Sequence, residues 1–299
     1  MAINYSGLSA FHAVAEAESF TGAARARNVS QPTLSAQVRA LEDEYGVRLF
    51  DRIGRQVRLT PLGQSLFVIT SRLFSAQDEA QALLAGTRTL QRGHLRIAAD
   101  SATHVMAALA RMREKYPGLT FSLTIGNSSE VVDQLMDFAA DVAITARQSS
   151  DPRLHAVKLR ADTLVAFVSS SHPLARHESM PIEAFAGQDV VLRERGSITR
   201  EVIETRLSEA GVKPANLLEV QSREAVREAI AAGFGIGVSF DAEFRPDPSL
   251  RRIVLTGADF NVGEYAACRT ERRRLPLVRG FLETVQELVD EEVRTRPPV

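Results

Sequence analysis

The sequence predicts an α+β multi-domain protein, with a small helical module, one long helix and a larger C-terminal region in which strands and helices alternate. Three observations support this prediction. Short capped amphipathic helices fill residues 8–63, one apolar seam runs through residues 61–90, and strand-like apolar runs recur between helical patterns from residue 94 onward. With 299 residues, 44% of them hydrophobic, the chain can bury more than one compact core.

The N-terminal module begins with two short predicted helices. Leu8 and Phe11 start an apolar stripe with the spacing of one helix face, which predicts a first helix. Thr21 follows an aromatic residue in the pattern of a hydrophobic staple and N-cap, which predicts a second helix at residues 22–27. Asn28, a residue that tolerates turn conformations, is expected to turn the chain before the next helix.

The next predicted helix opens at Ser30, whose side chain can cap the first turn, and Pro32 is tolerated inside that turn. Leu34, Val38 and Leu41 form its apolar stripe. A tight turn between two short helices, the second with a polar face, is typical of a helix-turn-helix whose second helix enters the major groove of DNA. A small helical bundle with ordinary caps is the alternative. The residues that would face DNA from this helix are Ser30, Gln31, Pro32, Thr33, Ser35, Gln37 and Arg39.

A hairpin wing is predicted after this helix. Residues 46–50 and 57–60 have the pattern of short strands, and the segment between them carries Arg52 and Arg55. The whole chain is nearly neutral, with 36 Lys and Arg against 37 Asp and Glu, so composition alone does not indicate a nucleic-acid partner. Basic residues beside a reading helix favour phosphate contact, although ordinary solvated arginines are the alternative. We therefore add Arg52 and Arg55 to the candidate DNA-binding residues.

A long helix is predicted from Pro61 to about residue 90, because apolar residues recur there in a four-three spacing. At ~1.5 Å per residue this helix would be about 45 Å long, too long to be buried by one small domain. We expect it to pair with the same helix of a second subunit, and such a homodimer should read a partly palindromic site. Packing against its own chain is the alternative. The seam consists of Leu62, Leu66, Ile69, Leu73, Ala76, Ala80 and Leu83.

The C-terminal region alternates between strand and helix patterns, which predicts a parallel, doubly wound sheet. The predicted strands are 94–99, 120–125, 141–145, 164–168, 217–220, 236–240 and 265–268. The predicted helices are 105–115, 129–138, 199–210, 222–232 and 276 to about 293.

Several motifs of the N-terminal module resemble the winged-helix signature of LysR-type transcriptional regulators. They are Leu8-Ser9-Ala10-Phe11, Ser19-Phe20-Thr21-Gly22-Ala23-Ala24, Val29-Ser30-Gln31-Pro32-Thr33-Leu34-Ser35, Leu41-Glu42, Gly46-Val47-Arg48-Leu49-Phe50-Asp51-Arg52 and Leu59-Thr60-Pro61-Leu62-Gly63. The length of the chain and its α/β remainder are similar to that family too, so the resemblance covers the whole chain. It implies a sequence-specific, DNA-binding transcriptional regulator whose dimers often join into a homotetramer.

The resemblance also implies that the C-terminal region is a two-lobed, periplasmic-binding-protein-like domain that senses a small molecule. We expect a winged helix-turn-helix domain at 1–62, a dimerisation linker helix at 63–91 and an effector-binding domain at 92–299. Lobe I would comprise 92–162 and 267–299, lobe II 163–266, and the chain would cross between lobes near 162–163 and 266–267.

In such a fold the ligand should lie between the lobes, at the carboxyl ends of strands and the N-termini of helices, where free N–H groups favour anions. We therefore expect a small anionic effector, with arginines suited to a carboxylate, phosphonate or phosphate group. For any single Ser or Thr at these points, a routine N-cap is the alternative. The candidate effector-binding residues are Ser101, Thr103, Asn127, Ser128, Thr145, Arg147, Ser197, Thr199, Arg200 and Phe234.

Two segments of the C-terminal region, 193–200 and 228–238, are also similar to regulators associated with aminoethylphosphonate catabolism. This resemblance implies that the effector is a phosphonate such as 2-aminoethylphosphonate.

The residues do not indicate an enzyme. Gly233, Gly235 and Gly237 follow a predicted helix and precede a strand, the reverse of the order in a dinucleotide-binding loop, so a helix C-cap and turn are expected there. The six histidines have no metal-ligand spacing, and the single cysteine, Cys268, has no evident base partner. We expect no metal and no cofactor other than a small-molecule co-inducer.

The N-terminus lacks the pattern of an export signal and no apolar run reaches ~18 residues, so we expect a cytoplasmic protein with no membrane partner. The expected partners are double-stranded promoter DNA, a second copy of the chain and the small anionic effector. Two other functions remain open at this point: a cytoplasmic small-molecule-binding protein, and a DNA-binding assembly protein without an effector. Ligand-induced thermal stabilisation would separate a sensor from an assembly protein.

Overall fold

The computed structural model describes residues 4–53, 56–84 and 93–295, and within them it describes side chains except at 52–53, 56, 78–79, 81–84, 104 and 292–295. The chain divides into two compact units, Met1–Arg88 with Asp137–Ala139, and Thr89–Met136 with Ala140–Val299. We refer to them as the reader and the sensor unit. The expected domain ranges 1–62, 63–91 and 92–299 stay predictions.

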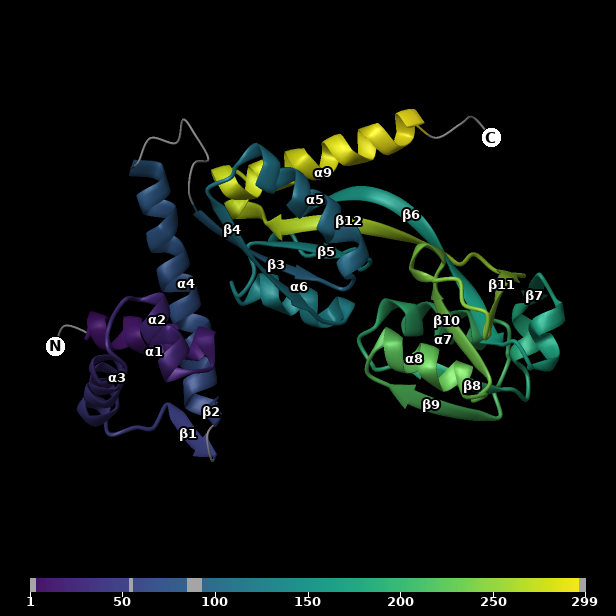
Figure 1. Ribbon diagram of the computed structural model, residues 1–299, viewed down its shortest axis with the longest axis horizontal. Helices are drawn as coiled ribbons and strands as arrows, with labels where there is room; N and C mark the ends of the chain where they lie inside the picture. The colour runs from purple at the N-terminus through teal and green to yellow at the C-terminus, as the bar shows by residue number, and fades with distance from the viewer. Residues whose placement is uncertain (1–3, 54–55, 85–92, 296–299) are drawn as a thin grey trace. The chain divides into compact units, whose positions relative to one another are not determined.

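The reader contains a three-helix layer, a two-stranded wing and one long helix (Figure 1). Side-chain caps begin its first helices, as short-range sequence rules require. Its elements are α1 (Tyr5–Ala17), α2 (Phe20–Ala26), α3 (Gln31–Tyr45), β1 (Phe50–Ile53), β2 (Gln56–Leu59) and α4 (Pro61–Leu84).

Two local expectations for the reader were wrong. The helix α2 begins two residues earlier than expected, because the side chain of Ser19, and not that of Thr21, accepts the capping hydrogen bond from the N–H of Gly22. The first wing strand begins at Phe50 instead of residue 46, because the carboxylate of Glu42 accepts the Leu49 N–H at 2.7 Å in place of a strand partner.

The reader core lies where α1 crosses α2 and α3. Leu8, Phe11 and Val14 of the predicted stripe are buried, as are Leu34 and Leu41 of the second stripe. The core therefore consists of the residues whose periodicity predicted these helices.

The helix α4 carries both a buried and an exposed row of side chains. Thr70 is buried and bonds through its hydroxyl to the ring of His12 at 3.1 Å, which ties α4 to α1. Leu62, Ile69 and Leu73 of the predicted seam are 50%, 59% and 41% exposed. Within a single chain, these three seam residues thus face solvent, whereas Leu66 packs against the reader core.

The sensor unit is built on one connected sheet that serves two lobes. The sheet of the first lobe has the order β4–β3–β5–β12–β6, in which β3 runs parallel to β4 and β5, and β12 runs antiparallel to its neighbours. Its strands are β3 (Gly93–Ala99), β4 (Leu119–Ile125), β5 (Val142–Thr145), β12 (Asn261–Arg269) and the first part of β6 (Leu154–Ser169).

The second lobe continues from the same strand, because β6 pairs with β12 through Thr163, with β10 from Leu164 onward and with β11 from Val165 onward. The order then runs β6–β10–β8–β9, with β11 and β7 on the other side of β6. These strands are β7 (Ser179–Pro181), β8 (Asp189–Arg193), β9 (Asn216–Val220), β10 (Ile236–Phe240) and β11 (Leu250–Thr256).

Helices cover both faces of each lobe (Figure 1). In the first lobe α5 and α9 share one core and α6 packs on the opposite face. In the second lobe α7 and α8 cover opposite faces. Their bounds are α5 (Ala102–Lys115), α6 (Ser128–Met136), α7 (Ile198–Glu209), α8 (Arg223–Ala231) and α9 (Pro276–Thr295), with short 3-10 helices at Pro173–Arg176, Ile182–Phe185, Asp241–Glu243 and Thr270–Arg272.

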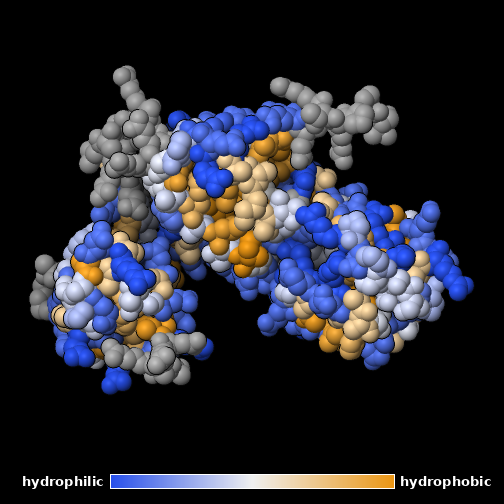
Figure 2. Space-filling view, in the orientation of Figure 1, coloured by the Kyte–Doolittle hydropathy of each residue, from blue (hydrophilic) through white to orange (hydrophobic). Residues whose placement is uncertain are grey.

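Side-chain packing leaves some apolar surface uncovered. Figure 2 shows hydrophobic residues gathered on one face of the first lobe. Two large hydrophobic residues of this lobe are exposed, Met106 of α5 at 51% and Ile125 of β4 at 50%. None of the helices in the described part of the chain is long and apolar enough to cross a membrane.

The topology corrects two expectations. The sheet is mixed instead of fully parallel, because the two strands that connect the lobes, β6 and β12, run antiparallel to each other. The return to the first lobe comes earlier than the expected crossing at 266–267, because β12 already pairs with β6 at Asn261. The first crossing, after Thr163, lies where we expected it.

Candidate functional sites

The first candidate site is the exposed face of α3 in the reader. Ser30 caps the helix by accepting the N–H of Thr33 at 3.2 Å, and its hydroxyl also lies 2.7 Å from the hydroxyl of Thr33. Both residues are exposed, together with Gln31 and Pro32. The cap thus presents two hydroxyl groups and an amide at the N-terminal turn, the part of a recognition helix that contacts base edges.

The middle of α3 continues the polar face. Ser35 and Gln37 are half-buried, and Arg39 is exposed. The side chain of Arg52 and all of Arg55 lie outside the described residues, so the wing is represented by Arg58 of β2, which is exposed. A helix with a polar N-terminal turn and an exposed arginine can contact both base edges and phosphates.

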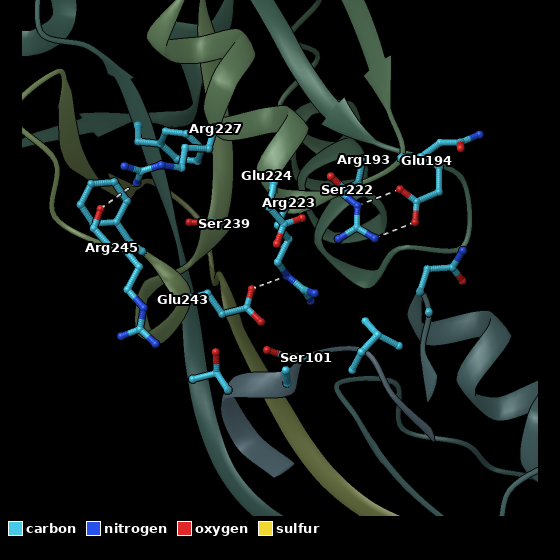
Figure 3. A pocket seen from close by; sticks show the side chains of 18 of the residues that line it. Ser101, Arg193, Glu194, Ser222, Arg223, Glu224, Arg227, Ser239, Glu243 and Arg245 are labelled. Carbon is cyan, nitrogen blue, oxygen red and sulfur yellow. Dashed lines mark hydrogen bonds and ion pairs between the residues drawn. The ribbon is translucent and has the colours of Figure 1, made fainter. Parts of the chain in front are cut away.

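The second candidate site is a cavity of about 770 Å³ in the sensor unit (Figure 3). It opens at the N-terminal turns of α5 and α8, where backbone N–H groups point outward. Its lining is rich in arginine and glutamate. The lining residues are Ser101, Ala102, Thr103, Ile125, Gly126, Asn127, Glu130, Phe167, Arg193, Glu194, Gln221, Ser222, Arg223, Glu224, Arg227, Ser239, Glu243, Phe244, Arg245 and Leu250.

Ion pairs hold most of these arginines. Arg193 binds Glu194 through two hydrogen bonds of 2.7 Å, and Arg223 donates to Glu243 at 2.7 Å (Figure 3). Arg227 pairs with Asp247, outside the lining. Most of the arginine charges on the cavity wall are therefore balanced by a neighbouring carboxylate.

Two polar groups on the wall lack such partners. The side chain of Arg245 is exposed and makes no hydrogen bond or ion pair with any residue that the structure describes. The hydroxyl of Ser239 is buried and has no hydrogen-bond partner within the described part of the chain. A buried hydroxyl without a protein partner is costly, so it is available to bond to a water or to a molecule bound in the cavity.

Burial raises the pKa of two carboxyl groups of the sensor unit, of which Glu243 lines this cavity and Glu264 does not. Burial raises the pKa of Glu243, and the opposing charge of Arg223 does not cancel the effect. Burial likewise raises the pKa of Glu264, on β12, to about 7, against the charge of Arg160.

Three of the sequence-predicted effector residues lie in the cavity lining, namely Ser101, Thr103 and Asn127. Ser128 and Thr145 lie outside it and donate their hydroxyls to the carboxylate of Asp100, at 2.7 and 3.1 Å. These two hydroxyls tie the start of α6 and the end of β5 to Asp100, the residue that follows β3.

The remaining predicted effector residues also lie outside the lining. Arg147, which follows β5 of the first lobe, pairs with Glu201 and donates to the carbonyl of Gly196. These contacts of Arg147 join the two lobes. Arg200 bonds to Glu204, Glu219 and the carbonyl of Arg193 within the second lobe. Ser197 and Thr199 are buried at the start of α7, and Phe234 is 56% exposed in the turn after α8.

Sequence reasoning missed the side of the cavity that the second lobe supplies. Ser222 begins α8 by accepting the N–H of Ala225 at 3.0 Å, so the rule that selected Ser101 would have selected it too. Arg223 and Arg227 follow one turn apart on that helix. No local sequence rule could have selected Glu243, because the turn after β10 places this residue in the cavity wall.

The described residues do not favour metal or thiol chemistry. Among them, no group of three His, Cys, Asp or Glu side chains is placed to hold a metal ion. Cys268 is buried in β12, and burial raises the pKa of its thiol to about 11, so the reactive thiolate is disfavoured.

Comparison with known families matches both units. Residues 6–64 match the family described as "Bacterial regulatory helix-turn-helix protein, lysR family", and residues 88–290 match the "LysR substrate binding domain".

Individual relatives span most of the chain. The RuBisCO operon transcriptional regulator of Allochromatium vinosum is 30% identical over 95% of this chain and 96% of its own length. The HTH-type transcriptional activator CmpR of Synechocystis sp. is 31% identical over 76% of each chain. Among solved structures, a full-length OxyR variant from Pseudomonas aeruginosa shares the fold, with a TM-score of 0.71, 20% identity and coverage of 96% and 95% of the two chains.

Proposed function

Because this chain belongs to the LysR family, and is thus a DNA-binding transcriptional regulator with an effector-binding domain and not an enzyme, we propose that α3 reads promoter DNA while the sensor cavity binds a small molecule with an anionic group. The observation that carries the ligand class is the guanidinium of Arg245, which has no partner among the described residues, in a cavity whose wall also includes the N-terminal turn of α8. A DNA partner implies a cytoplasmic location.

The unpartnered Ser239 hydroxyl supports the same ligand class. An anionic oxygen that enters the cavity can accept hydrogen bonds from a hydroxyl, from helix N–H groups and from a guanidinium. Phosphonates such as 2-aminoethylphosphonate, and phosphate, sulfate and dicarboxylates, all carry such oxygens. Because two segments resemble regulators of aminoethylphosphonate catabolism, this phosphonate is the first candidate to test.

For the DNA-reading part of the proposal, Ser30, Gln31, Thr33, Ser35 and Gln37 contact base edges or nearby phosphates. Arg39, Arg52 and Arg55 contact phosphates or the minor groove. A homodimer formed through α4 would present two such faces to a partly palindromic site, and two dimers would join into a tetramer.

The effector proposal is tested by thermal unfolding of the full chain with each candidate anion. A true ligand raises the melting temperature by a few degrees when present far above its dissociation constant. Arg245→Gln and Ser239→Ala should each reduce that rise. Arg195→Gln is the matched control, since Arg195 is equally exposed but lies outside the cavity lining.

Two outcomes would contradict the effector proposal. If no anion raises the melting temperature, the cavity takes another ligand class or the protein is an assembly factor without an effector. If a rise is lost in Ser197→Ala or Thr199→Ala but kept in Arg245→Gln and Ser239→Ala, the ligand binds at the start of α7 and not in this cavity.

A further inference from the structure

Arg223 takes part in three contacts at once. As the first residue of α8 it lines the cavity (Figure 3). Its Nε donates to a carboxylate oxygen of Glu243 at 2.7 Å, and its Nη1 donates to the backbone carbonyl of Asp100. Since Asp100 follows β3 of the first lobe, this single guanidinium joins the cavity, a buried carboxylate and the contact between the lobes.

The carboxylate of Glu243 belongs to a cluster that we define as Asp100, Glu243 and Glu264. These residues come from the end of β3, the turn after β10 and β12, and they line a second, much smaller cavity together with Asp162 of β6. Asp100 and Glu264 are buried, and the side chain of Glu243 is only 6% exposed. Three buried carboxyl groups around one small cavity repel one another when ionised.

Few opposite charges face this cluster. Arg223 approaches it from α8, and Arg160 of β6 donates to Glu264 at 2.8 Å. Asp162 adds a further carboxylate, which accepts the N–H groups of Thr163 and Ala242. Ser128, Thr145 and the N–H of Ala146 all bond to one oxygen of Asp100. On the Glu243 side, Arg223 supplies an opposite charge and the side chain of Ser101 adds a hydrogen bond.

Proton affinities in the cluster follow from this arrangement. Burial raises the pKa of Glu243, and the charge of Arg223 opposes the rise while that of Asp100 adds to it. Burial raises the pKa of Glu264 to about 7, and both Asp100 and Glu243 add to that rise. Weakening the Arg223–Glu243 pair raises the pKa of Glu243 further, because the opposing charge moves away from the carboxylate.

We propose that an anion bound in the larger cavity takes the guanidinium of Arg223 from Glu243, and that the cluster takes up a proton from solvent in exchange. This inference rests on the proposed function and adds its regulation. Binding of the anion becomes tighter as the pH falls, by up to about tenfold per pH unit for one coupled proton. The exchange also alters the Arg223–Asp100 contact, so the ligand acts on the packing of the lobes.

The direct test is isothermal titration of inorganic sulfate into the full chain near pH 7. Sulfate stays a dianion throughout this range, so its own titration adds nothing. Tris, imidazole and triethanolamine as chloride salts differ in ionisation enthalpy and supply no oxyanion. The slope of the binding enthalpy against the ionisation enthalpy of the buffer gives the protons taken up, for which we expect a value above zero and up to about one per sulfate.

Glu243→Gln should bind sulfate with little proton uptake, because Arg223 then has no carboxylate partner to leave. Arg227→Gln is the matched control, one turn along α8 in the same cavity wall, with its partner Asp247 outside the cluster. The Arg227→Gln variant should still take up protons when it binds sulfate, whatever its affinity for sulfate. Sulfate binding without uptake, or uptake unchanged in Glu243→Gln, overturns the inference while leaving the anion site in place.

If sulfate does not bind, the pH dependence of folding stability without ligand tests the coupling between Arg223 and Glu243. In Arg223→Gln, the pKa of Glu243 in the folded chain should move further above that in the unfolded chain. The resulting stability is present at low pH and is lost as the pH rises through the folded value. Relative to the parent, Arg223→Gln should therefore become less stable from pH 5.5 to 8.5, and Arg223→Gln/Glu243→Gln should not. A deficit independent of pH overturns the inference.

Discussion

Gly7 lies where α1 crosses α3, and its missing side chain sets the distance between the two helices. A Cβ placed there would lie 2.9 Å from the Cβ of Leu41 and 3.2 Å from the carbonyl oxygen of Gln37. Gly22, in the next helix, has its nearest such neighbour, Ser19, at 3.4 Å, which is ordinary contact. An added methyl group would therefore be crowded at Gly7 and would fit at Gly22.

Replacing these glycines by alanine should have opposite effects. Gly7→Ala should destabilise the reader by roughly 1–3 kcal/mol, because α1 and α3 must move apart. Gly22→Ala should stabilise it by up to about 1 kcal/mol, because alanine is the better helix former. Urea unfolding monitored by circular dichroism checks both, and equal effects would show that the helix crossing is not tight.

Asp141 is a second residue on which packing depends. Its carboxylate accepts from Arg96 at 2.8 Å and Arg272 at 2.6 Å, both largely buried. Burial raises the pKa of Asp141, but the hydrogen bonds and charges of these two arginines outweigh burial and leave it lowered.

Asp141→Asn should destabilise the sensor unit by roughly 3–5 kcal/mol, because it leaves buried guanidinium charge uncompensated. The stability that the lowered pKa provides is present above the unfolded value and is lost as the pH falls through the folded one. The difference between parent and variant should therefore shrink between pH 6 and pH 3. Asp151→Asn is the control, since Asp151 has a lowered pKa but pairs with Arg153 at the surface.

At the scale of elements, we propose that α3 uses its N-terminal part to contact bases and its later part to contact phosphates. Its N-terminal turn presents hydroxyl and amide groups, whereas Arg39 lies two turns further on. Base edges are read by bidentate polar groups, and phosphates attract charge without regard to sequence.

Gln37→Ala should lose ~1–3 kcal/mol of discrimination between a specific and a random duplex. Arg39→Gln should weaken binding to both duplexes by a similar factor, and it should reduce the slope of log affinity against log salt concentration by about one unit. Fluorescence anisotropy at several salt concentrations separates the two effects. Equal losses on both duplexes for both variants would contradict this division of α3.

The exposed apolar side chains of α4, Leu62, Ile69 and Leu73, lead to a separate prediction about self-association. Ile69→Glu and Leu73→Glu should weaken self-association at least about tenfold, because each places a charge in an apolar contact. Gln64→Glu, at an exposed position outside the seam, should not. Sedimentation equilibrium of the full chain measures this, and unchanged association in all three variants would place the dimer contact elsewhere.

Over the whole molecule, sequence reasoning succeeded where the structure depends on near neighbours. The Ser30 cap and the apolar stripes of α1 and α3 could be predicted because their partners lie within a few residues. It failed for strand direction, since alternation of strands and helices does not distinguish parallel from antiparallel crossings. The first half of β6 escaped because polar Lys158 and Arg160 interrupt its apolar pattern.

The candidate cavity was predictable only in part, for the same reason. Ser101 and Asn127 stand at helix starts that local rules identify. Arg223 became part of the site through its contact with Asp100, which is 123 residues away in the sequence. Contacts at that separation are set by the fold and leave no mark in the local pattern.

The 16-residue strand β6 passes through both lobes without a break, and its ladder changes partners between Thr163 and Leu164. At that point the amide of Leu164 donates to the carbonyl of Phe260, on the other connecting segment. Because β6 pairs with both lobes, sliding one lobe past the other would break ladder hydrogen bonds, whereas twisting about β6 would break fewer of them. Hydrogen exchange at the single amide of Leu164 would therefore register how often the sensor unit flexes.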